Sequence, residues 1–77
     1  MNGSYALTAM ILIALDHHQG QWCALAWLAD RVMAPLDVVQ QHCQELVDHD
    51  MALALVIDGR QFYGVEADAA TVTELVQ

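Results

Sequence analysis

The 77 residues are enough for one domain, 1–77, with a thin core, because a chain this short buries only about 60% of its unfolded surface. A hydrophobic content of 57% excludes a disordered chain and leaves apolar surface for a second copy to cover. Ten Asp and Glu residues against two Arg and no Lys give a net charge of −8. This charge disfavours DNA as a partner, because proteins hold DNA largely with cations that neutralise its phosphates.

The first predicted element is a helix over residues 5–18. Its apolar residues recur at spacings of three and four, which is typical of a helix with a buried face. These residues are Leu7, Met10, Ile11, Ala14 and Leu15. Leu12 and Ile13 widen the apolar stripe, so we expect this helix to be covered on more than one side. Asn2 and Ser4 are the candidate N-caps of this helix, and Gly20 is the residue expected to end it.

Residues 21–23 predict a short strand, and residues 25–32 predict a second helix with an apolar face formed by Leu25, Leu28 and Val32. Pro35 cannot continue that helix but is suited to open a third one. The core stripe predicted for the third helix consists of Leu36, Val39, Cys43, Leu46 and Val47. The opposite face carries Val38, Gln41, Gln44, Glu45 and Asp48.

After residue 50 the spacing of apolar residues changes to that of strands. The run "MALALVI" predicts a strand, and "RQFYGV" predicts its partner. Between them, Asp58–Gly59 predicts a type I′ turn, in which both central residues have positive φ. The last run, "ADAATVTELVQ", predicts a short C-terminal helix. The predicted fold is therefore α+β, mainly α: a winged helix-turn-helix with a three-helix core, a β-hairpin wing over about residues 51–65 and a short C-terminal helix.

Three segments carry a resemblance to a known family: "YALTAM", "LAWLAD" and "VVQQHCQELVDHDMAL". Over residues 4–66 the chain resembles the winged-helix domain of small bacterial transcriptional repressors. It is most similar to the iron–sulfur-cluster and nitric-oxide-responsive regulators, and more loosely similar to the multiple-antibiotic-resistance repressors. The resemblance implies a bacterial protein of transcription regulation. Cluster-binding members carry cysteines after the wing, whereas here no cysteine follows Cys43, so we expect no cofactor.

Two functions stay open for such a domain. As a DNA-binding transcriptional regulator, it would read bases with helix 36–49 and the wing, because Gln pairs with adenine, Val contacts the thymine methyl and Arg enters minor grooves. The candidate residues are Val38, Gln40, Gln41, Gln44 and Arg60. As a homodimer or a subunit of a regulatory complex, with itself or a basic protein as the partner, it would use aromatic anchors such as Trp22 and Tyr63. We expect Trp27 and Phe62 in the core. The acidic charge favours protein contacts.

Catalysis and metal binding are not expected. Ser4 is the only serine, and the sequence contains neither a nucleophile–base pair with local support nor a Gly-rich phosphate loop. His42 and His49 lie seven residues apart on the third helix, without the closely paired ligands of structural zinc sites, and we expect surface histidines there. Cys23 and Cys43 lack CxxC spacing and are expected to be reduced, buried thiols. Because the apolar N-terminal run has no basic segment and is closed by Asp16, we expect a cytoplasmic protein with no membrane partner.

Overall fold

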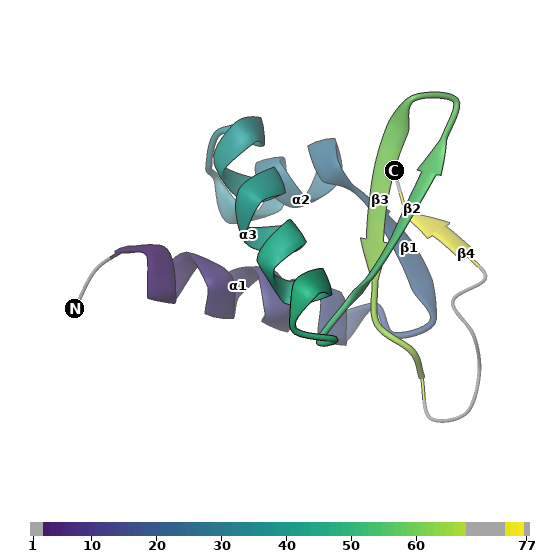
Figure 1. Cartoon of the computed structure of the whole chain (residues 1–77), viewed down its shortest axis with the longest axis horizontal. Helices are drawn as coiled ribbons and strands as arrows, with labels where there is room; N and C mark the ends of the chain where they lie inside the picture. The colour runs from purple at the N-terminus through teal and green to yellow at the C-terminus, as the bar shows by residue number, and fades with distance from the viewer. Residues whose placement is uncertain (1–2, 68–73, 77) are drawn as a thin grey trace.

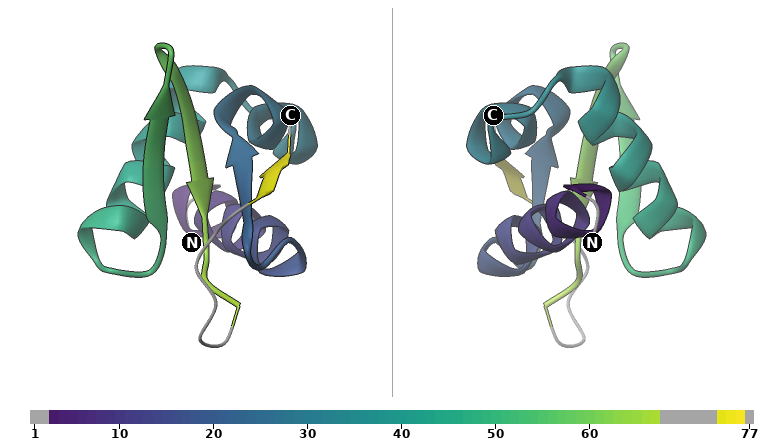
Figure 2. Two further views of the ribbon diagram at one scale, coloured as in Figure 1. Left: turned by 90° about the vertical axis from the view of Figure 1, so that its right-hand side faces the viewer. Right: turned by 90° about the vertical axis from the view of Figure 1, so that its left-hand side faces the viewer.

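The structure, a computed structural model, describes the backbone of residues 3–67 and 74–76 and the side chains of residues 6–67. The elements follow in the order α1 (Gly3–His17), β1 (Gln21–Ala24), α2 (Leu25–Val32), α3 (Leu36–Asp48), β2 (Leu53–Ile57), β3 (Arg60–Gly64) and β4 (Glu74–Val76). Three helices form one layer and a sheet forms the other (Figures 1 and 2). The α+β winged-helix arrangement predicted from the sequence is thereby confirmed.

The three helices contact one another, and their shared core extends to the sheet. The buried members on the helices are Ile11, Ala14, Leu15, Leu28, Ala29, Val32, Val39, Cys43 and Leu46. The predicted core stripe of α3 is thus confirmed for its three central positions. It is wrong for Leu36, whose side chain is 51% exposed. Leu36 is the first residue of α3 and lines an open groove at the turn from α2, where the described part of the chain leaves it uncovered.

The helix ends agree only partly with the predicted caps. Asn2 lies outside the described residues, and Ser4 is not an N-cap because α1 already begins at Gly3. Gly20 adopts a φ of 81°, the left-handed conformation expected of a residue that ends a helix region. Pro35 is the N-cap of α3, with an extended backbone, and its carbonyl accepts a hydrogen bond of 3.0 Å from the N–H of Val39.

The sheet has the strand order β2-β3-β1-β4. β2 and β3 form the antiparallel hairpin of the wing, and β3 pairs antiparallel with β1. At the hairpin turn Asp58 and Gly59 have φ values of 51° and 77°, so the predicted turn with two positive φ angles is confirmed. No helix forms over Glu74–Val76; this segment is β4, which runs parallel to β1. The predicted C-terminal helix is therefore wrong there, and its residues 68–73 and 77 lie outside the described residues.

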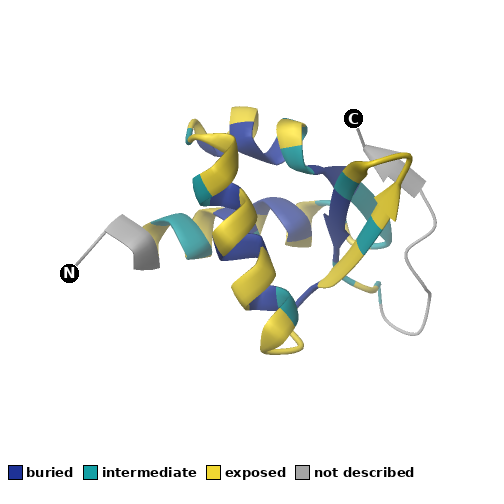
Figure 3. Ribbon diagram, turned by 45° about the horizontal axis from the view of Figure 1, so that its top comes forward, coloured by how far each residue is buried: buried dark blue, intermediate teal, exposed yellow. Residues whose placement is uncertain are grey.

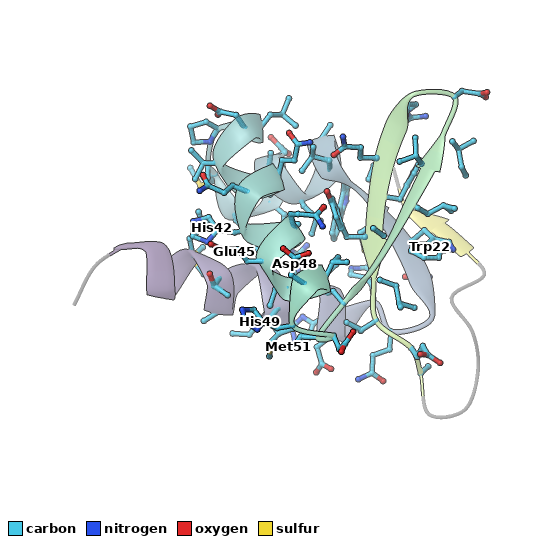
Figure 4. All side chains as sticks on the ribbon, viewed as in Figure 1. Trp22, His42, Glu45, Asp48, His49 and Met51 are labelled. Carbon is cyan, nitrogen blue, oxygen red and sulfur yellow. The ribbon has the colours of Figure 1, made fainter. Side chains whose placement is uncertain are left out.

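The strand register decides which side chains face the helices. Cys23 is paired with Tyr63, and both belong to the core between the two layers. Because side chains alternate along a strand, Ala24 and its partner Phe62 lie on the opposite face of the sheet. Trp22 also lies on the side of the sheet away from the helices (Figure 4). The sheet therefore separates a core face from an outer face that carries aromatic residues.

Candidate interaction surfaces

The exposed face of α3 brings together the residues predicted to read DNA. Gln40, Gln41 and Gln44 are exposed, and Val38 is half-buried. The three glutamines line a shallow groove of about 440 Å³, and the other lining residues are Asp37, Glu45 and Asp48. Gln44 is already engaged, since its Nε2 donates to Oδ1 of Asp48 over 3.1 Å. The structure thus gathers the predicted polar face and places three carboxylates within it.

The wing contributes Arg60 from the first position of β3. Arg60 is exposed, and its guanidinium carbon lies 5.3 Å from the ring centroid of Phe62. This distance is within the range of a cation–π contact, which orients the guanidinium over the ring. Arg31, the second arginine of the chain, lies 5.5 Å from the ring centroid of Trp27 on α2. Neither α3 nor β2 contributes an arginine or lysine to the wing side of the molecule.

The aromatic residues divide between core and surface. Tyr63 is 3% exposed and belongs to the core, so it is not a surface residue of the monomer as the sequence had suggested. Its hydroxyl donates to Oε1 of Gln61 over 3.2 Å. Phe62, at 2% exposure, is buried as expected, and Trp27 packs partly buried against the core. Trp22 is half-buried on the outer face of the sheet, and its place in an interface stays a prediction.

Among the exposed large apolar side chains, those at two places lie close to the predicted DNA-reading surface. One is the turn between α2 and α3, where Met33 is 90% exposed in a left-handed conformation with a φ of 56°. Met33 and Leu36 line an open groove of about 540 Å³ there. The other is β2, an edge strand without a charged residue, on which Val56 is 65% exposed. Figure 3 shows how exposed residues follow the wing and α3. Exposed edges of this kind can accept a strand of another chain.

A buried histidine was missed by the sequence analysis, which expected surface histidines. His42 is 8% exposed, and its Nδ1 lies 2.8 Å from Oγ1 of Thr8 on α1. Oε1 of Glu45 lies 3.9 Å from the same nitrogen. Because Thr8 and Glu45 approach one nitrogen, the three side chains cannot relay a proton through the ring as a hydrolase triad does. Figure 4 shows His42 and His49 at separate positions along α3. Its position was predictable, because His42 follows Val39 by three residues and precedes Leu46 by four, on the buried side of α3. Its partner Thr8 on α1 was not, because the sequence does not show where α1 crosses α3.

The two cysteines are free and fully buried, as expected. Burial raises the pKa of the Cys23 thiol from 9.0 to about 11. Burial, with a smaller contribution from Cys23, raises the pKa of the Cys43 thiol to about 12. Burial also raises the pKa of Tyr63, with a smaller contribution from Cys43. Thiols that stay protonated at neutral pH are poor nucleophiles and poor metal ligands.

Among the described residues, no group of three or more His, Cys, Asp and Glu side chains could hold a metal ion. Within the same part of the chain, no helix combines the length and apolar character needed to cross a membrane. Comparisons with family models, with curated proteins and with solved structures find no match for this chain. The resemblance to winged-helix repressors therefore stays a prediction.

Proposed function

We propose that this chain is a non-enzymatic winged-helix regulatory domain that acts through protein contacts, as a homodimer or as a subunit of a regulatory complex. The observation that carries the proposal is the acidic α3 face. Asp37, Glu45 and Asp48 line its groove, in the position where a DNA-reading helix would approach phosphates. Phosphate contacts hold a protein on DNA while base contacts only specify the sequence, so glutamines without cations are a poor DNA-binding set.

The exposed apolar residues support the same proposal. At the start of α3, a DNA-reading surface would need polar or basic groups, whereas this chain exposes Met33 and Leu36 there. On the wing, Val56 and Ile57 are 65% and 39% exposed on the edge strand β2. Apolar side chains and an unpaired strand edge are features by which proteins bind other proteins, and neither contributes to binding a polyanion.

The second candidate is a transcriptional regulator that binds specific DNA sequences. It is favoured by the exposure of Gln40, Gln41 and Gln44 on one helix and by Arg60 next to the wing turn. In this reading Gln side chains would contact base edges and Arg60 would enter the adjacent minor groove.

One titration separates the two functions. The isotope-labelled chain is mixed with a mixed-sequence DNA duplex at low salt, and NMR shifts are followed residue by residue. The proposal expects no shifts that saturate with DNA. Shifts centred on Val38–Glu45 and Arg60 that weaken with added salt would overturn it. In that event Arg60→Ala should lower the slope of the logarithm of the binding constant against the logarithm of the salt concentration by about one unit, because one phosphate contact is lost. The matched control, Arg31→Ala, removes the other arginine from α2 and should leave that dependence unchanged.

A further inference from the structure

The edge strand β2 lacks the features by which proteins usually protect such an edge. It is the outermost strand of the sheet as far as the chain is described, and it pairs with β3 at all five of its positions, so the ladder contains no bulge. Its sequence, LALVI, contains neither proline nor a charged residue. Because bulges, prolines and charges are the usual means of preventing contact with another chain, the free edge of β2 is available to an added strand.

One face of this edge is apolar. Leu55 pairs with Phe62, which lies on the outer face of the sheet. Because side chains alternate along a strand, Leu53, Leu55 and Ile57 share that face. Arg60 lies there too, with its guanidinium over the ring of Phe62. A strand added to β2 would therefore place apolar side chains beside those of β2 on the outer face.

The other face of the edge is turned towards α3. Ala54 pairs with Tyr63, a residue of the core, so the intervening positions of β2 face the helix layer. α3 contacts β2, and in the left view of Figure 2 it lies behind β2 and extends beyond the free edge of that strand. An added strand would therefore cover part of the exposed face of α3, with every second side chain directed towards this helix.

The part of α3 that such a strand would cover is acidic. Asp48 is exposed and accepts a hydrogen bond from Nε2 of Gln44. Figure 4 shows Asp48 nearer to the wing than Glu45 and His42. Asp37 lies at the other end of the same groove. Neither α3 nor β2 contains a Lys or Arg, so these carboxylates favour cations supplied by the partner.

We propose that β2 accepts, as an added strand, an extended segment of another protein in which apolar residues alternate with lysine or arginine. The apolar residues pack on the outer face beside the side chains of β2, and the basic residues face Asp48 and the acidic groove of α3. Main-chain hydrogen bonds along β2 supply affinity, and the alternation supplies selectivity. This inference rests on the proposed function, since it names the chemistry of the protein partner and the surface that binds it.

A second copy of the chain does not fit this surface. Two β2 strands that pair antiparallel in one sheet are related by a two-fold axis perpendicular to it, so both helix layers would lie on the same side. The acidic faces of the two α3 helices would then approach each other, and like charges repel. With no Lys and two Arg in 77 residues, the chain itself supplies no segment of alternating basic residues.

An NMR titration of the full isotope-labelled chain tests the proposal, with amide hydrogen exchange as a second readout. The probe is a capped peptide of about seven residues in which valine and lysine alternate. Because the N–H groups of successive strand residues point to opposite edges, binding should slow exchange at every second residue of β2. A peptide of the same composition with its lysines grouped at one end should bind at least about tenfold more weakly. A peptide with glutamate in place of lysine should show no saturable binding.

A pair of matched variants tests the role of the α3 carboxylates. Asp48→Asn removes the charge and keeps an oxygen that can accept from Gln44. It should weaken binding of the alternating peptide by about two- to fivefold and make it less dependent on salt. The control, Asp16→Asn on α1, makes the same change of net charge. Asp16 is also exposed near the end of its helix, and its Oδ1 accepts from Nε2 of Gln19 over 2.6 Å. This control should bind the peptide like the wild type.

Three results would overturn the strand addition. One is an alternating peptide that causes no saturable change in the chain. Another is equal binding of the alternating and grouped peptides with shifts confined to α3, which would leave charge attraction alone. The third is a glutamate peptide that binds as tightly as the lysine peptide, or two Asp→Asn variants that bind equally well.

The DNA titration reports separately on the proposed function. A chain that binds neither DNA nor the alternating peptide would retain the proposed function and refute this inference. A chain that takes up the peptide along β2 and also binds DNA through α3 and Arg60 would do the reverse.

Discussion

Oγ1 of Thr8 on α1 and Nδ1 of His42 on α3 lie 2.8 Å apart, and this hydrogen bond joins the two helices next to an apolar core. His42 is the one buried polar side chain among the residues whose side chains are described. A buried polar group that loses its partner is penalised by its full desolvation, which exceeds the net value of the bond itself. The pair therefore fixes how α1 and α3 pack.

Thr8→Val replaces the hydroxyl by a methyl group of similar size and leaves Nδ1 of His42 without this partner. We expect the free energy of unfolding to fall by about 1–3 kcal/mol. Urea denaturation at one protein concentration measures the change. The control, Gln44→Ala, breaks an exposed hydrogen bond to Asp48 on the same helix and should change stability by less than about 0.5 kcal/mol. Equal stabilities of wild type and Thr8→Val would show that the bond does not hold the helices together.

The sequence predicts the wing well because its signals are local. A type I′ turn requires two residues that tolerate positive φ, and Asp58–Gly59 meets this requirement without help from the rest of the chain. The prediction of a C-terminal helix is wrong for the opposite reason, because the structure of that segment is not decided locally. A short apolar run around Leu75 fits a helix or a strand equally well, and pairing with β1 decides between them.

The candidate surfaces were predictable to a similar, partial extent. Helical spacing places Gln40, Gln41 and Gln44 on the exposed side of α3, as observed. For the strand residue Tyr63, the sequence could not show which face of the sheet carries its side chain. That depends on the strand register, in which Tyr63 pairs with Cys23. Helical spacing does put His42 on the buried side of α3 with Val39 and Leu46, but it could not show that Thr8 on α1 is its partner.

The buried thiols predict a loss of stability at alkaline pH. In the folded chain the pKa of Cys23 is raised to about 11 and that of Cys43 to about 12, whereas both thiols have a pKa of 9.0 once exposed. Above pH 9 the unfolded chain therefore loses protons that the folded chain keeps, so stability is complete below pH 9 and declines as the pH rises towards 11. Each thiol can contribute a slope of up to about 1.4 kcal/mol per pH unit.

Urea denaturation between neutral pH and pH 11 measures this decline. The control is Cys23→Ala, whose stability is lower at neutral pH but should fall less steeply above pH 9, because one of the two titrating thiols is gone. If the slopes of the two proteins agree, the alkaline loss has another origin.

Gly59 offers a test of the wing turn. Its φ of 77° is strained for any residue with a side chain, although a Cβ added there would meet no other atom within 4 Å. Gly59→Ala should therefore lower stability by about 1 kcal/mol through backbone strain alone. Thermal unfolding followed by circular dichroism detects such a change. Asp58→Asn is the matched control, since Asn tolerates the left-handed conformation of Asp58 and should leave stability within about 0.5 kcal/mol. An unaffected Gly59→Ala would imply that the turn readily takes another form.

At the C-terminal end of α2, Met33 is a residue with a side chain in a conformation that favours glycine. It adopts a φ of 56° although it is not a glycine, and with 90% exposure its side chain gains little from packing. Left-handed conformation costs an L-residue about 1–2 kcal/mol, whereas Gly loses roughly 0.5–1 kcal/mol through its greater freedom when unfolded. Met33→Gly should therefore raise stability by about 0.5 kcal/mol or more, in line with the preference for Gly after helix ends. Gln41→Gly, at an exposed position inside α3, should instead lower it by about 1 kcal/mol. If Met33→Gly stabilises the isolated chain but weakens a complex with a partner, the exposed side chain of Met33 contributes to binding that partner. If it destabilises the isolated chain, the side chain of Met33 packs against the protein itself.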